Sequence, residues 1–133
     1  MRPGNDGTER LPDRAVFVRV LRRILPLALL LAACSKGAEA DLTYIGEARS
    51  LAAEWALVND QANKGHLTAN YIRTMRKSLR EQLQTTAQSL TQPNSDYGRE
   101  IAALLNEPDD AAPEQLREHS DKLKRIEDSL ESA

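Results

Sequence analysis

Three side chains in this sequence belong to the types that most often carry out chemistry in small proteins: Cys34, His66 and His119. A metal site needs several histidine, cysteine or carboxylate ligands at set spacings, and the two histidines lie far apart in the chain. The motifs typical of serine hydrolases, zinc proteases and nucleotide-binding loops do not occur. We therefore expect no enzyme, no cofactor and no metal site. A single cysteine also excludes an intramolecular disulfide.

Cys34 ends a short apolar run, residues 24–33, which follows Arg19, Arg22 and Arg23. A transmembrane helix needs about 20 apolar residues, whereas the apolar part of a signal peptide has about 7–15. Arginines before such a run are typical of the positively charged segment that stays inside the cell during export. The run therefore predicts a signal peptide rather than a membrane-spanning helix.

The end of this run, Leu31-Ala32-Ala33-Cys34, resembles the lipobox of bacterial lipoprotein precursors. The resemblance covers the precursor signal, from about Arg19 to Ser35. It implies that the Cys34 thiol receives diacylglycerol and that the chain is cut between Ala33 and Cys34. Two or three acyl chains then anchor the protein stably in a membrane. Ser35 after the cysteine implies the periplasmic face of the outer membrane. The alternatives are an ordinary secretory cleavage site or an uncleaved anchor.

The chain divides into four expected segments. Residues 1–17 are turn-rich and mixed in charge, which indicates a disordered or wrongly assigned N-terminal extension. The expected start codons encode Val16, Val18 or Val20. Residues 18–33 form the lipoprotein signal peptide, and residues 34–40 carry the lipidated cysteine and a flexible tether. Residues 41–133 form the folded domain.

The composition indicates one small acidic domain. The 133 residues are 41% hydrophobic and 4% aromatic, and the formal net charge is −2. Without the six basic and three acidic residues of positions 1–33, the remaining chain has a net charge of −5. Nucleic-acid binding rewards a clustered basic surface, so a nucleic-acid partner is not expected.

Apolar residues recur at helical spacing after residue 41, with Gly and Pro between the stretches. This pattern predicts helices over residues 42–64, 68–92, 96–106 and 113–130. The fold class is all-α. We expect a small antiparallel helical bundle in which two long helices form a hairpin. One short helix and one long C-terminal helix cover the apolar side of this hairpin.

Individual residues mark the helix ends and the core. Gly65 is expected to cap the first helix and Thr68 to cap the second. Trp55 lies on the apolar face of the first helix and is interpreted as a core residue, with a binding anchor as the alternative. His66 is interpreted as a solvated turn residue. Gly98 is expected to weaken the first turn of the third helix.

The last helix carries a seam of apolar residues at steps of three and four, typical of a packed helix face. The seam consists of Leu116, His119, Leu123, Ile126 and Leu130. We interpret His119 as a partly buried packing residue of this seam. Packing against the first two helices is favoured over self-association. On its outer faces the helix is expected to form the pairs Glu118–Lys122 and Asp121–Arg125.

The strongest charge feature of the folded domain lies on the second predicted helix. Its basic stripe consists of Arg73, Arg76, Lys77 and Arg80. One interpretation is a docking surface for an anionic surface or an acidic partner. The other is an ordinary solvated face that pairs with Glu47 and Glu54 on the first helix, where such surface pairs contribute about 0–1 kcal/mol each.

These features predict a lipid-anchored helical protein of the bacterial envelope with a non-catalytic binding or structural role. Its expected partners are the membrane, through the lipid on Cys34, and an envelope protein. The alternative is an accessory subunit or inhibitor that regulates an envelope enzyme or assembly machine. An unrecognised hydrolase that uses His119 is a weaker third interpretation. The sequence does not indicate an oligomeric state.

Overall fold

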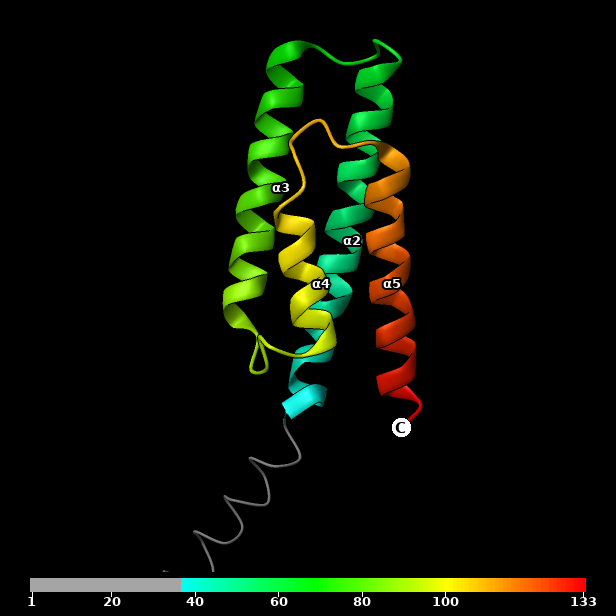
Figure 1. The fold of residues 1–133 in the computed structure, drawn as a ribbon. Helices are drawn as coiled ribbons and strands as arrows, with labels where there is room; N and C mark the ends of the chain where they lie inside the picture. Colours follow the sequence, from blue (N-terminus) through cyan, green and yellow to red (C-terminus); the bar gives the residue numbers. More distant parts are fainter. Residues whose placement is uncertain (1–36) are drawn as a thin grey trace, which may run out of the picture. The chain divides into compact units, whose positions relative to one another are not determined.

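Four α-helices make up residues 37–133, the part of the chain that the computed structural model describes, and this part contains no strand (Figure 1). The helices are α2 (Gly37–Asn63), α3 (Ala69–Ser89), α4 (Asp96–Leu105) and α5 (Pro113–Glu131). The predicted all-α bundle is therefore confirmed. The predicted signal peptide, with Ala33 and Cys34, lies outside the described residues.

The first helix begins earlier than its sequence pattern predicts. α2 starts at Gly37 rather than at residue 42, so the prediction of a flexible tether is wrong for residues 37–40. Contacts from a distant loop hold this first turn. The Thr91 hydroxyl donates to the Gly37 carbonyl at 3.0 Å, across 54 positions of sequence. A pattern read locally along the chain does not contain such a contact.

The turn between α2 and α3 has the predicted caps at both sides. Gly65 has a φ of 71°, and it is the only residue with positive φ among those described. The N–H groups of Gly65 and His66 donate to carbonyls in the last turn of α2 at 3.0 Å. On the other side, the Thr68 hydroxyl accepts from the Tyr71 N–H at 3.2 Å. Both helix ends thus satisfy backbone groups that would otherwise lack partners.

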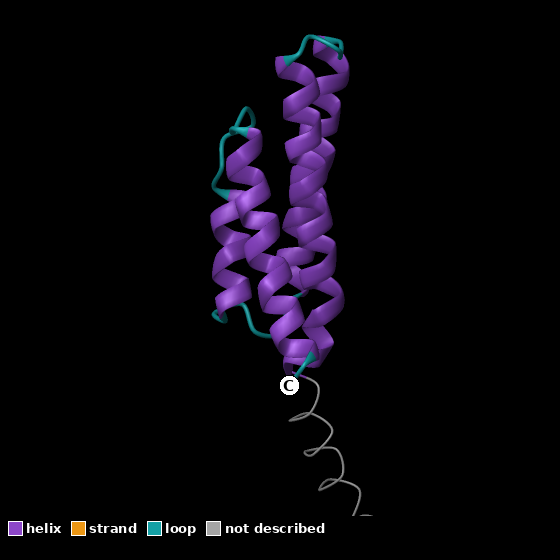
Figure 2. Ribbon diagram, turned by 90° about the vertical axis from the view of Figure 1, so that its right-hand side faces the viewer, coloured by secondary structure: helices purple, strands orange, loops and turns teal. Residues whose placement is uncertain are grey.

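The α2–α3 hairpin is the frame of the bundle, and α2 contacts each of the other helices. α4 lies between α3 and α5 and contacts both (Figure 1). The hairpin extends beyond the α4–α5 loop at its tip, as the side view shows (Figure 2). The expectation that α5 packs on the first two helices is wrong in one detail: α5 packs on α2 and α4, because α4 occupies the space in front of α3.

α2 contributes more buried apolar residues to the core than any other helix. Trp55 is 1% exposed, so its interpretation as a core residue is confirmed. The apolar residues buried with it come from all four helices and from the α4–α5 loop. They are Ile45, Ala48, Leu51, Ala52, Ala56, Val58, Leu79, Leu83, Tyr97, Ile101, Leu104, Ala111, Leu116 and Leu123. None of the helices in residues 37–133 combines the length and the apolar character that crossing a membrane requires.

Candidate functional site

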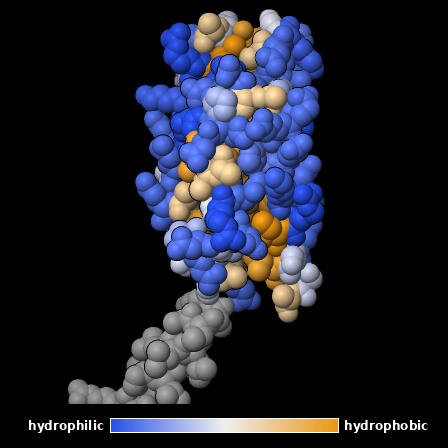
Figure 3. All heavy atoms as spheres, in the orientation of Figure 1, coloured by the Kyte–Doolittle hydropathy of each residue, from blue (hydrophilic) through white to orange (hydrophobic). Residues whose placement is uncertain are grey.

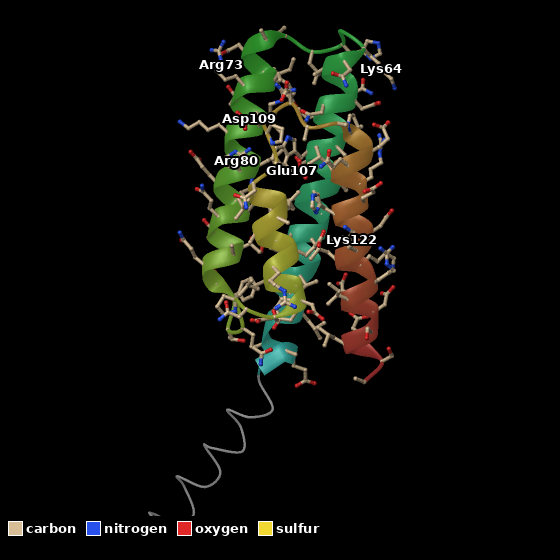
Figure 4. All side chains as sticks on the ribbon, viewed as in Figure 1. Lys64, Arg73, Arg80, Glu107, Asp109 and Lys122 are labelled. Atoms are coloured by element: carbon tan, nitrogen blue, oxygen red, sulfur yellow. The ribbon has the colours of Figure 1, made fainter. Side chains whose placement is uncertain are left out.

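The four cations of the basic stripe lie along α3 but have two different environments. Arg76 and Arg80 are half-buried, whereas Arg73 and Lys77 are exposed. Figure 4 labels Arg80 beside Asp109 of the α4–α5 loop and Arg73 closer to the hairpin tip. The structure therefore separates a pair that serves the fold from a pair that remains on the surface.

Arg80 holds the α4–α5 loop against α3. Its guanidinium donates to the carbonyl of Leu105 at 2.7 Å and to that of Glu107 at 2.9 Å. It also donates to the Asp109 carboxylate, at 2.8 Å and 3.1 Å, and lies 5.0 Å above the centre of the Trp55 ring. The last carbonyls of a helix lack partners within the helix and carry partial negative charge, which favours a cation there.

Asn59 continues this network from α2. It is 1% exposed, and its amide donates to the carbonyls of Asp109 at 3.1 Å and Ala111 at 2.8 Å. Its oxygen accepts from Arg76 Nε at 2.9 Å, and the Trp55 indole donates to the Asp109 carbonyl at 3.0 Å. The sequence pattern does not by itself show this role of Asn59. The available signal was its position one turn after Trp55, on the apolar face of the helix.

The suggested pairing of the stripe with Glu47 and Glu54 is wrong, although Arg73 and Lys77 are exposed, as the interpretation of a solvated face predicts. Among the described residues, the stripe makes its ion pairs with Asp109 and Glu81. Both Glu47 and Glu54 are exposed. The carboxylate that pairs with Arg80 belongs instead to Asp109 in the α4–α5 loop. Sequence spacing alone does not say which side of α2 its neighbour covers.

The exposed half of the stripe borders a surface hollow, which we call the α3 groove. It has a volume of about 610 Å³ and is lined by residues including Ile72, Arg73, Arg76, Lys77, Arg80 and Asp109. Lys77 Nζ lies 3.9 Å from Glu81, and both side chains are more than 60% exposed (77% and 63%). Arg73 forms no ion pair within residues 37–133. Two cations are thus available to an incoming anion, because a pair as exposed as Lys77–Glu81 is weak.

His119 is buried in the seam, as predicted, but it has a polar role that the pattern does not show. Its Nδ1 lies 2.6 Å from Glu100 and its Nε2 lies 2.8 Å from Glu107. The His119 side chain is 10% exposed. Both ring nitrogens donate at once only when the imidazole carries two protons. This bridge joins α5 to α4 and to the α4–α5 loop. His66 is exposed, as predicted.

Asp41 is a second buried polar residue whose contacts the sequence pattern does not show. It is fully buried, and its carboxylate accepts from the N–H groups of Thr91 and Gln92 and from the Tyr97 hydroxyl at 2.7–3.1 Å. Burial raises the pKa of Asp41, but these hydrogen bonds outweigh it, so the pKa lies below its usual value. Burial and the bond to Asp41 raise the pKa of Tyr97. Asp41 thus ties the α3–α4 loop to the start of α2.

The outer face of α5 is less paired than its sequence predicts. The expected pairs Glu118–Lys122 and Asp121–Arg125 are absent from the ion pairs of residues 37–133. The pairs on this helix are instead Arg117 with Glu114, Lys124 with Asp128, and cross-helix contacts to α2. Exposed pairs one turn apart stabilise a helix by only about 0.2–0.5 kcal/mol, so spacing does not determine which of them form. Lys122 and Arg125 form no ion pair with any residue of the described part of the chain.

Within residues 37–133, no group of three or more histidine, cysteine, aspartate or glutamate side chains is arranged to hold a metal ion. Comparisons with known protein families, with curated proteins and with solved structures found no match. What the bundle binds must therefore be inferred from its own surface.

Proposed function

We propose that this protein is a lipid-anchored component of the bacterial envelope with a non-catalytic binding role, and that the α3 groove receives an acidic segment of an envelope protein. The anchor is supported by the lipobox resemblance of Leu31-Ala32-Ala33-Cys34. The proposed location is the periplasmic face of the outer membrane, on the evidence of Ser35. No catalytic role is assigned to any residue.

The proposed binding role rests on one observation: half of the basic stripe is used by the fold and half remains exposed. Arg80 is committed to the α4–α5 loop, whereas Arg73 and Lys77 stand at the rim of the α3 groove. Stability does not require them there, because exposed charges contribute little to it. The domain as a whole is acidic, but these two cations give the α3 groove a local positive potential. Such a potential favours an acidic partner.

The length of α2 supports the same arrangement. α2 has 27 residues and is therefore about 40 Å long at about 1.5 Å per residue. In the sequence only Ser35 and Lys36 lie between Cys34 and Gly37, so a lipid on Cys34 would be joined to the start of α2 by a short link. The α3 groove starts at Ala69, in the first turn after the hairpin tip. A partner bound there is held well away from the anchored end of the bundle.

The first test is the chemical state of the anchor. Mass spectrometry of the mature N-terminal peptide should show a diacylglycerol-modified Cys34 as the first residue. A chain that retains Ala33, or an unmodified Cys34, would refute the lipid anchor. A Cys34→Ala variant should lose its membrane association in cell fractionation.

The second test addresses the α3 groove in intact cells. A photoreactive amino acid at Ala69, which lines the groove, should crosslink to an acidic envelope protein. The Arg73→Gln/Lys77→Gln variant should reduce this crosslink at least several-fold, because it removes the attractive charges. Lys122→Gln/Arg125→Gln removes the same charge from a different surface and should not. Equal yields from all three proteins would end the docking proposal.

The partner pattern in the same experiment separates two versions of the role. One dominant crosslinked protein would indicate an accessory subunit or inhibitor of that protein. The concave shape of the α3 groove favours this version, since a hollow of about 610 Å³ suits one defined segment. Several weak partners that all depend on Arg73 and Lys77 would indicate a general binding role in the envelope.

A further inference from the structure

A second surface groove lies at the opposite end of the bundle from the hairpin tip. This α4–α5 groove has a volume of about 630 Å³ and is lined by the first half of α4 and the second half of α5. Ala38, in the first turn of α2, also lines it. The groove is therefore at the end of the bundle where α2 begins, and Ala38 lies four positions after Cys34 in the sequence.

The groove has an apolar floor. Ile126 and Leu130, one turn apart on α5, line it and are only partly buried by the bundle. Figure 3 shows hydrophobic surface gathered on this face over the lower part of α5, beside α4. Most of the remaining face is hydrophilic. Exposed apolar surface inside a polar rim is typical of a binding groove.

The charges around this floor are unequal. Two acidic side chains line the groove, and both have partners: Asp96 pairs with Arg99, and Glu100 binds His119. The cations Lys122 and Arg125 also line it, are exposed, and pair with no carboxylate within residues 37–133. With Arg99, the lining has three basic and two acidic side chains, so its net charge is positive although the domain as a whole is acidic.

We propose that the α4–α5 groove binds an anionic phospholipid of the membrane that holds the protein. Lys122 and Arg125 would contact the lipid phosphate, and Ile126 and Leu130 would contact the first methylenes of its chains. Ligand sites of this kind usually have volumes of about 300–1,000 Å³, and this groove falls within that range. This proposal rests on the proposed lipid anchor.

The position of the α4–α5 groove near the proposed anchor favours a lipid over other anions as its ligand. A chain spans at most about 3.3–3.6 Å per residue, so Ala38 stays within about 15 Å of Cys34 in any conformation. If Cys34 is lipidated, the groove remains within reach of the headgroups. The polar headgroup and interfacial region adds roughly 5–8 Å on each side of the hydrocarbon core, a distance that this short link can span. Basic side chains near such a surface attract anionic lipids.

The test uses the full-length protein, processed and lipidated in a bacterial host and reconstituted into vesicles. One set of vesicles contains phosphatidylcholine alone, and the other also contains phosphatidylglycerol. Each contains a trace of photoactivatable phosphatidylglycerol whose reactive group lies near the headgroup. We expect crosslinks to concentrate in residues 95–100 and 122–130. Excess unlabelled phosphatidylglycerol should compete for them, and added inorganic phosphate should not.

Two variants of equal charge make the test specific. Lys122→Gln/Arg125→Gln should reduce the crosslinks at least about tenfold, because each basic residue near an anionic surface contributes about fivefold. Arg73→Gln/Lys77→Gln, altered at the other groove, should stay within about twofold of the natural protein. The replaced side chains are exposed, and unchanged thermal unfolding would verify that both variants fold.

Other outcomes would overturn the proposal. Crosslinks spread over the whole surface, or equally reduced by both variants, would show non-specific attraction. Protein–protein crosslinks through residues 122–130 would assign the groove to a second copy of the chain. A lipidated protein without groove crosslinks refutes only this inference, whereas an unlipidated Cys34 refutes the proposed anchor and this inference together.

Discussion

At the scale of single residues, two charged side chains do most to hold the interhelical loops in place. Asp41 accepts hydrogen bonds from the α3–α4 loop, and Arg80 donates them to the α4–α5 loop. Each reaches backbone groups that would lack partners near a helix end. Replacing either side chain should therefore affect the stability of the bundle, whereas replacing Arg73 should not.

Asp41→Asn should lower the free energy of unfolding by about 2–3 kcal/mol at pH 7, because the amide retains one acceptor and turns its NH2 group toward buried donors. Urea denaturation followed by circular dichroism measures this difference. Asp110→Asn is the matched control, since Asp110 is exposed and makes no side-chain hydrogen bond among residues 37–133. It should change stability by less than about 0.5 kcal/mol.

The same residue predicts a pH dependence. The hydrogen bonds hold the folded-state pKa of Asp41 below its value in the unfolded chain, which is about 3.9. Its carboxylate therefore stabilises the fold fully above that unfolded pKa, and the contribution is lost as the pH falls through the lower folded pKa. The stability gap between the natural protein and Asp41→Asn should narrow below about pH 4. A gap that stays constant down to pH 2 would contradict this role.

Arg80→Lys should destabilise the bundle by about 1–3 kcal/mol although it conserves the charge. One ammonium group cannot reach the carbonyls of Leu105 and Glu107 and the Asp109 carboxylate together. The near-ultraviolet circular dichroism of Trp55 should also change, because the guanidinium lies over its ring. Arg73→Lys, at an exposed position of the same helix, is the control. If Arg80→Lys were as stable as the natural protein, a positive charge at position 80 would be enough to hold the α4–α5 loop.

At the scale of helices, Gly98 shows why local propensity misleads. A Cβ atom at Gly98 would meet the Pro93 carbonyl oxygen at 2.2 Å, so the start of α4 requires a residue without a side chain. Glycine is a poor helix former, and its presence here was expected only to weaken the first turn. The close approach of the α3–α4 loop is the physical reason for it.

Gly98→Ala should therefore destabilise the protein by about 1–3 kcal/mol, despite the better helix propensity of alanine. Gly46→Ala in α2 is the matched comparison, because its Cβ would meet only side-chain atoms, the nearest being a carboxylate oxygen of Glu127 at 3.0 Å, and no backbone atom. The free energy of unfolding of Gly46→Ala should rise by up to about 1 kcal/mol, because alanine is the better helix former. Thermal unfolding measures both variants. If the unfolding temperature changed in the same direction for Gly98→Ala and Gly46→Ala, the explanation for Gly98 would be contradicted.

At the scale of the whole molecule, the bundle has two distinct ends. The α4–α5 groove lies where α2 begins, and the α3 groove starts next to the hairpin tip. Within residues 37–133, the lining cations without an ion pair are Lys122 and Arg125 at the α4–α5 groove and Arg73 at the α3 groove, where Arg76 is held by Asn59. Together with an anchor at Cys34, this arrangement would let one end contact the membrane while the other meets a protein partner.

Lengthening the link between the lipid and the bundle tests that arrangement. Inserting about ten Gly and Ser residues between Lys36 and Gly37 should reduce crosslinking of phosphatidylglycerol to the α4–α5 groove several-fold, because a longer flexible linker lowers the effective concentration of the membrane surface. Crosslinking from Ala69 to a protein partner should change less. Equal losses at both grooves would show that the two ends do not act separately.

The sequence by itself determined the fold class, the caps at Gly65 and Thr68, and the core position of Trp55. These follow from helical spacing and from local backbone preferences, which neighbouring residues set. Only the tertiary structure decided which cations of α3 remain free and that Asp41 and Asn59 are buried. It also decided that Gly37–Ala40 is helical. Those outcomes depend on contacts between residues tens of positions apart, such as Arg80 with Asp109 and Asp41 with Thr91. The spacing of apolar residues along one helix does not predict such contacts.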